Sequence, residues 1–278
     1  MKYADKLLWS LFILYALIFF NDLFFNLQGI HLSPSFSMYK LIFLTFPVAI
    51  IIYHSFFTLG LYRALMLITL SASIGTAMEY FGLKYGVFFG GHYTYTSQPS
   101  LFNVPIVIIF FWAVFIYIGY TIVNSFFIWL GRRKPNIRNR KIWLLPILVF
   151  FDGIIVVMID LFMDPIQVKL GNWKWLEGGS YFGVPPGNFV GWFIVVILST
   201  GLFRLYEYFF PSRSPQYNKR ILFIPVLGYG MVGIALAIHA MNFHMNVLML
   251  LGSVMMFSVV ILNFIVYIFH IKTLKIIE

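Results

Sequence analysis

The stretch DPIQVKLGNWKWLEGGSYFGVPPGNFVGW, residues Asp164 to Trp192, decides how the rest of the chain is interpreted. It holds an acid, two alternating tryptophans, a double glycine and a double proline, and long apolar segments flank it on both sides. Glycine and proline interrupt regular structure, and tryptophan is frequent where membrane helices meet water. The stretch is therefore predicted to be a polar, aromatic connection between two membrane-spanning helices.

The composition of the whole chain agrees with a membrane protein. Of its 278 residues, 61% are hydrophobic and only 10% are charged, whereas a soluble domain carries about 25% charged residues. The absence of cysteine excludes disulfides, thiolate catalysis and cysteine-bound metal. A formal net charge of +10 would suggest nucleic acid as the partner of a soluble protein. Here the positive residues cluster in short loops, so they indicate topology and no nucleic-acid partner.

Eight segments are apolar over the roughly 20 residues that a helix needs to cross a bilayer. We therefore expect an all-α, polytopic membrane protein that forms one integral membrane domain over residues 1–278. The eight predicted spans lie near Leu7–Phe25, Lys40–Leu59, Tyr62–Phe81, Val104–Leu130, Ile142–Met163, Asn188–Phe210, Ile221–Ala240 and Asn246–Ile271.

The distribution of lysine and arginine predicts the orientation of these spans in the cell membrane. The two most basic loops are Gly131–Lys141 and Pro211–Arg220, and basic loops stay on the cytoplasmic side. Counting spans outward from these loops places both termini in the cytoplasm. The connection after the third span and the connection after the fifth span then lie on the opposite face.

A second stretch, EYFGLKYGVFFGGHYTYTSQPSLFNVPIVIIFFW (Glu79–Trp112), is a loose copy of the first. In both, an acid precedes a glycine by seven positions, and two alternating aromatic residues precede a Val-Pro pair by the same spacing. The second copy lacks five residues of the connection. The matched pairs are Glu79 and Asp164, Gly86 and Gly171, Tyr93 and Trp173, Tyr95 and Trp175, Pro105 and Pro185, and Trp112 and Trp192. The pattern predicts a parallel internal repeat of helices three-four and five-six, related by a pseudo-two-fold axis along the membrane normal. Its motif-bearing core is about residues 70–210.

The repeat singles out three acids, because ionisable groups inside membrane helices are costly and often functional. A pseudo-two-fold axis would bring Glu79 and Asp164 towards each other, and Asp160 lies one helical turn before Asp164 on the same face. The competing interpretation places these acids at solvated helix ends and the nearby aromatic residues in an interfacial belt.

Other polar residues are interpreted as structural. Asp152, near the middle of its span, is expected to hydrogen-bond to another helix, and Arg204 with Glu207 is expected to form a structural pair. His239 and His244 are five residues apart, a poor helical spacing for a shared metal. The sequence has no glycine-rich phosphate cradle, no aspartate-rich diphosphate motif and no serine elbow, so phosphorylated substrates and acyl transfer lack support.

Together the two stretches resemble the membrane-embedded carotenoid 1′,2′-hydratases of the CruF type, which include the archaeal bisanhydrobacterioruberin hydratase. The resemblance covers about residues 70–210 and is most specific in the second stretch, in acid-Pro, Gly-x-Trp-x-Trp, Tyr-Phe-Gly-Val-Pro and Gly-Trp. It implies a hydro-lyase that adds water across the terminal C=C of an acyclic carotenoid, without cofactor or metal. It also implies the lipid bilayer and other membrane enzymes of the carotenoid pathway as partners.

The residue types suit this chemistry. Hydration of a trisubstituted alkene needs a proton donor, a shelter for a tertiary cation and one positioned water. A carboxyl group in an apolar site can stay protonated as a general acid, and a second carboxylate can orient the water and accept its proton. We expect Asp164 and Glu79 to divide these roles, with Asp160 as the alternative partner of Asp164. Aromatic faces stabilise cations; the expected substrate-binding residues are Tyr93, Tyr95, Trp173, Trp175, Tyr181 and Asn188.

Three other functions fit the same residues. A carotenoid end-group cyclase would use the same protonation, but an internal double bond would capture the cation and no water would be added. A transporter of a small solute would also place a site between repeats. A lipid-binding scaffold without catalysis would tolerate loss of the acids.

Overall fold

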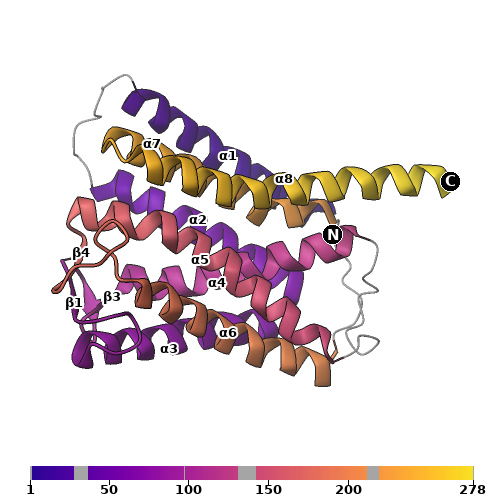
Figure 1. Cartoon of the computed structure of the whole chain (residues 1–278). Coiled ribbons are helices and arrows are strands. Elements are labelled where there is room, and N and C mark those ends of the chain that lie inside the picture. The colour runs from indigo at the N-terminus through magenta and orange to yellow at the C-terminus, as the bar shows by residue number, and fades with distance from the viewer. Residues whose placement is uncertain (1, 28–36, 97, 131–141, 212–218, 278) are drawn as a thin grey trace.

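The computed structural model describes residues 2–27, 37–96, 98–130, 142–211 and 219–277, and eight helices account for most of them (Figure 1). The predicted all-α architecture is confirmed. The helices are α1 (Lys2–Leu27), α2 (Ser37–Leu59), α3 (Leu61–Tyr85), α4 (Ile106–Trp129), α5 (Leu144–Leu170), α6 (Pro186–Phe209), α7 (Phe223–Asn242) and α8 (Asn246–Ile277). The short 3-10 helix η2 (Lys219–Leu222) precedes α7.

The helices run alternately up and down one bundle. Figure 1 shows both termini at one end and the connections that carry the short strands at the other. Seven helices are long and apolar enough to cross a membrane, and α2 adds an apolar stretch over Thr45–Leu59. The basic segments behind the predicted orientation, 131–141 and most of 211–220, lie outside the described residues.

The predicted parallel repeat is confirmed by a pair of strands. Strand β1 (Tyr93–Tyr95) pairs in antiparallel fashion with β4 (Trp173–Trp175), and the central residues Thr94 and Lys174 lie opposite each other. Because these two residues are counterparts in the repeat, a local two-fold axis passes between them. The helices obey the same symmetry: α3 packs against α4 and α6, as α5 packs against α6 and α4.

Helix α4 forms the centre of the bundle. Its residues 112–125 are all buried, and a helix that is apolar on every side is best accommodated in such a core. The first repeat reaches α4 through a small hairpin of β2 (Ser100–Leu101) and β3 (Val104–Pro105). Around the repeat core, α1 packs against α2, and α7 packs against α8.

The ends of α3 and α5 differ from the prediction in a way that matters for the site. The predicted spans ended at Phe81 and Met163, but the helices continue for another turn or more, to Tyr85 and Leu170. Both stop at a glycine in the left-handed conformation, Gly86 with φ 66° and Gly171 with φ 74°, which only glycine adopts without steric cost. Asp164, which lay just beyond its predicted span, therefore lies within its helix, as Glu79 does.

Candidate active site

The carboxylate of Glu79, on α3, is held by three hydrogen-bond donors. The hydroxyl of Tyr93 donates to Oε2 at 2.6 Å, and the hydroxyl of Tyr95 donates to the same oxygen at 2.9 Å. The indole Nε1 of Trp112 donates to Oε1 at 3.3 Å. Only 2% of Glu79 is exposed, so these donors replace the water that a carboxylate otherwise requires.

The two acids of α5 share one donor. The amide Nδ2 of Asn188, on α6, donates to Oδ2 of Asp160 at 2.9 Å and to Oδ2 of Asp164 at 2.8 Å. Both acids are buried, and their Oδ1 atoms are buried without a hydrogen-bond partner among the described residues. The two carboxyl groups therefore form a pair, as the spacing of one helical turn predicted.

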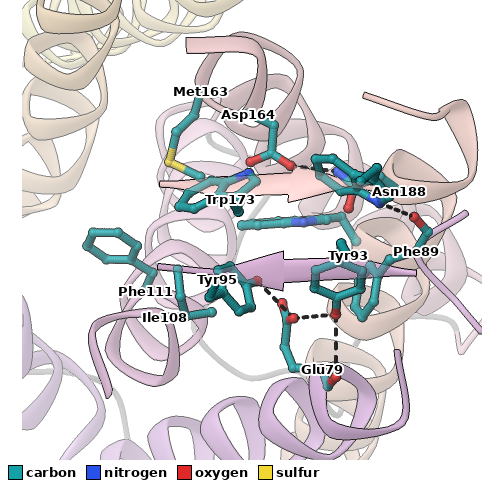
Figure 2. A pocket seen from close by; sticks show the side chains of 12 residues that line it. Glu79, Phe89, Tyr93, Tyr95, Ile108, Phe111, Met163, Asp164, Trp173 and Asn188 are labelled. Carbon is teal, nitrogen blue, oxygen red and sulfur yellow. Dashed lines mark hydrogen bonds between the residues drawn. The ribbon is translucent and has the colours of Figure 1, made fainter. Parts of the chain in front are cut away.

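Glu79 and Asp164 line the same small cavity of about 10 Å³, roughly the space that one water molecule needs. In Figure 2, Glu79 lies below β1 and Asp164 lies above β4, with aromatic rings of the two strands between them. The two acids thus face the cavity from opposite sides.

Pro165 directly follows Asp164 inside α5. A proline has no N–H, so it cannot donate the helical hydrogen bond to the carbonyl oxygen one turn earlier. Helix α5 nevertheless continues through this position to Leu170.

Aromatic rings enclose this cavity. The ring of Tyr93 lies 5.6 Å from that of Trp175, and the ring of Tyr95 lies 5.6 Å from that of Trp173. Trp175 is fixed by a hydrogen bond from its Nε1 to the carbonyl oxygen of Phe89, at 2.9 Å. Because three of these four rings are buried and the fourth is half-buried, they do not form an interfacial belt.

Burial keeps the two tyrosines protonated. It raises the pKa of Tyr93 and of Tyr95 above the ordinary tyrosine value, and the neighbouring Glu79 carboxylate raises both further. The phenols therefore remain O–H donors towards Glu79 at any physiological pH.

The structure brings most of the predicted site residues together. Glu79, Asp164 and Asn188 line the cavity with the aromatic residues of β1 and β4. Asp160 joins them through Asn188. Tyr181 does not line the cavity; it packs against Phe189 with ring centroids 5.3 Å apart. Burial raises the pKa of Tyr181, and nearby Asp160 adds to this effect.

Several residues of the site were not predicted from the sequence. Trp192 lines the cavity, and its ring lies 4.1 Å from that of its repeat counterpart Trp112. The repeat alignment matched these tryptophans, so the signal was present but was not interpreted as part of the site. The other unpredicted lining residues are apolar: Phe89, Ile108, Phe111 and Met163.

The two repeat-related halves of the site carry different side chains at equivalent positions. By the repeat alignment, Gly75 occupies the position of Asp160 in the first half, and Ile108 occupies the position of Asn188. A Cβ atom at Gly75 would lie 2.3 Å from Cγ of Trp112, so this position cannot carry a side chain while Trp112 reaches Glu79. One half holds a single acid with three donors, and the other holds a pair of acids with one donor.

A second buried polar cluster lies further along the bundle. Arg204 donates from Nε and from a terminal nitrogen to the two carboxylate oxygens of Asp152, each at 2.6 Å, which fits the structural role predicted for Asp152. Arg204 also donates to its repeat counterpart Asn124 at 3.1 Å. Glu207, predicted to pair with Arg204, accepts a hydrogen bond from Tyr120 at 2.7 Å and lies 3.9 Å from Arg63.

In the part of the chain that the structure describes, no group of three or more His, Asp or Glu side chains is placed so that it could hold a metal ion. In a comparison with known families, residues 36–265 match the family described as carotenoid biosynthesis protein. No curated protein and no solved structure shows a significant match to the chain.

Proposed function

Because the chain belongs to the carotenoid biosynthesis protein family, we propose that it hydrates an acyclic carotenoid at its terminal C=C bond. One observation carries this proposal: a cavity large enough for about one water lies between a pair of acids and a separate carboxylate that accepts three hydrogen bonds. Addition of water to an alkene changes no net oxidation state, so acid and base groups suffice for the chemistry.

The acid pair is suited to deliver the proton. Two ionised carboxylates that share one donor in a buried site repel each other, so the pair favours holding one proton. If one carboxyl keeps its proton, that O–H adds a second donor to the pair, beside the Asn188 amide, at a place where both Oδ1 atoms have no partner among the described residues. Asp164 lines the cavity and is the proton donor in this proposal, whereas Asp160 and Asn188 position it.

Glu79 is suited to be the base. Its three donors compensate the charge of the carboxylate, and charge-assisted hydrogen bonds of this kind are stronger than neutral ones. A carboxylate held in this way can orient a water molecule and accept its proton. Because Glu79 and Asp164 face the cavity from opposite sides, the alkene carbon atoms would lie between acid and base.

The reaction then balances in three steps. Asp164 transfers its proton to the less substituted carbon of the terminal double bond, and the adjacent carbon becomes a tertiary cation. The water oxygen forms a bond to that carbon, and one water proton passes to Glu79. The proton on Glu79 must finally return to Asp164, and both acids line the one cavity through which water can relay it.

The aromatic rings shelter the cation. The rings of Tyr93, Tyr95, Trp173 and Trp175 border the cavity, and the electron-rich face of an aromatic ring attracts a positive charge. The tyrosine hydroxyls are already committed to Glu79. They are therefore held away from capturing the cation in place of water.

The apolar bundle supports the proposed substrate and location. A carotenoid dissolves in the ~30 Å hydrocarbon core of a bilayer, and the helices have the length and apolar composition to lie in that core. We place both termini in the cytoplasm of a cell-membrane protein, with the site near the outer face. Reporter fusions at Asn136 and Gly179 test this orientation, and two reporters on the same side would contradict it.

Expression in a lycopene-producing host tests the activity. We expect an acyclic carotenoid that carries the mass of one or two added waters and keeps its acyclic absorbance. A ring-closed product without added mass would show a cyclase instead. If lycopene is unchanged, a longer acyclic carotenoid is tested in the same way. An unchanged pigment profile with both substrates would refute the proposed activity.

A further inference from the structure

A second and much larger cavity lies beside the site. It has a volume of about 300 Å³, it is lined almost entirely by apolar side chains, and it lies between α1, α2, α4, α5 and α7. For comparison, an apolar protein cavity of about 150 Å³ holds a benzene molecule. On α7 its lining extends from Ile224 to Leu236, which at about 1.5 Å per residue is roughly 18 Å along the bundle.

Two side chains belong to both cavities. Phe111 of α4 and Met163 of α5 line the large apolar cavity and also the small cavity of the acids. Met163 directly precedes Asp164 in the chain, and Figure 2 shows both side chains on the same side of the site. Among the described lining residues only these two are shared, so their side chains form the partition between the large apolar cavity and the acids.

The symmetry-related approach to the acids is closed. The repeat counterpart of Phe111 is Gly191, and a Cβ atom there would lie 2.6 Å from the ring of Phe89. Phe89 belongs to the five residues that the first copy has in addition, between Gly86 and Tyr93. Its ring is buried, and its carbonyl oxygen accepts the hydrogen bond from Trp175. The extra residues thus fill one side of a two-fold site and leave the apolar cavity beside the other.

We propose that the apolar cavity binds the isoprenoid chain of the substrate next to its reacting end, and that Phe111 and Met163 are the gate between this chain and the acids. The choice of ligand rests on the proposed function. The cavity adjoins the cavity of the acids at the two shared side chains, and its apolar lining matches a hydrocarbon chain. The acid cavity alone has room for about one water and not for the chain end, so the gate must move for the double bond to arrive. Methionine is suited to this task because its side chain is unbranched and adaptable.

Chain binding is tested by filling the cavity. Gly228 lines the apolar cavity, and a Cβ atom at this position would meet no atom within 4 Å. The variant Gly228→Trp therefore places an indole ring in the cavity. The matched control is Gly201→Trp, at a half-buried helical glycine outside the cavity whose Cβ would make ordinary contact with Val149 at 3.8 Å. Both changes are made in an Asp164→Asn background, which stops turnover, and each protein is purified from a lycopene-producing host.

The readout is the amount of lycopene that co-purifies with each variant. Displacing several carbon atoms of the chain should lower retained pigment roughly tenfold or more in Gly228→Trp, while Gly201→Trp keeps the pigment of the background. Equal pigment in the two variants, or a membrane-lipid acyl chain in place of pigment, would overturn the proposal. Because binding is measured without turnover, this result is independent of whether the wild-type protein hydrates lycopene.

The gate is tested separately with Met163→Trp in the otherwise unchanged protein. The larger side chain should keep the partition closed, so lycopene is retained while hydrated product is lost. Undiminished product would show that Met163 does not control the passage. Loss of the bound pigment itself would place Met163 within the chain site and would equally contradict its role as the gate.

Discussion

The shared donor Asn188 allows the sharpest test of how the acid pair works. Asn188→Leu keeps the approximate shape of the side chain and removes both hydrogen bonds, the one to Asp160 and the one to Asp164. By the repeat alignment, the first half of the site already has an apolar residue, Ile108, at this position. The helix backbone is therefore compatible with an apolar side chain here.

The expected magnitude follows from the two lost bonds. A hydrogen bond to a charged group contributes about 1.5–3 kcal/mol. If one such bond is needed to hold Asp164 in position during proton transfer, product formation should fall roughly ten- to a hundredfold. The buried carboxyl groups also lose the amide donor that they share, which should lower the free energy of unfolding by about 2–6 kcal/mol.

The assay separates these two effects. Hydrated carotenoid is measured per amount of purified protein, and thermal unfolding is measured on the same samples. Asn263→Leu is the control, because Asn263 is also buried and also bonds through its amide, accepting from Ser125 at 2.9 Å. The control should lose stability and keep its specific activity. Equal specific activities for wild type, Asn188→Leu and Asn263→Leu would refute the positioning role of Asn188.

Three further predictions concern the buried tyrosines of the site, Trp175 and the ion pair of Asp152 with Arg204. The buried tyrosines keep their protons above about pH 10, where an unfolded chain loses them, so stability should fall as the pH rises beyond that value. The double variant Tyr93→Phe, Tyr95→Phe should show a smaller alkaline loss, as measured by thermal unfolding against pH. Trp175→Phe should reduce product mildly and Trp175→Ala severely, because the cation needs an aromatic face; equal losses in pigment analysis would contradict this. Asp152→Asn leaves the Arg204 charge buried without its partner and should cost about 3–5 kcal/mol of stability. Product per folded protein should not change in that variant.

Much of the fold could be predicted from the sequence because a membrane-spanning helix is visible as a run of about 20 apolar residues. All eight segments were found, and the repeat was found because unlike residue types recur at equal spacing. The ends of α3 and α5 were placed too early. Polar residues and Pro165 look like helix breakers in a sequence, but a membrane helix tolerates both, and the helices end where Gly86 and Gly171 adopt the left-handed conformation.

The site was only partly predictable. Acids and alternating aromatic residues stand out against an apolar background, so Glu79 and Asp164 could be proposed as site residues from the sequence. The contribution of Trp112 and the partition by Phe111 were not, because α4 is apolar on every side and its sequence does not show which face meets the acids. The closing role of Phe89 depends on how five additional residues pack against Gly191. A single sequence shows that these residues are inserted, but it does not show how they pack.

The central claim is that Asp164 delivers the proton, and one substitution tests it most directly. Asp164→Asn retains an acceptor for the bond from Asn188, but an amide cannot donate a carboxylic proton. In a host that supplies the carotenoid hydrated by the wild-type protein, this variant should reach normal levels in the membrane and form no hydrated product. Hydrated carotenoid at the wild-type level from Asp164→Asn would contradict the account.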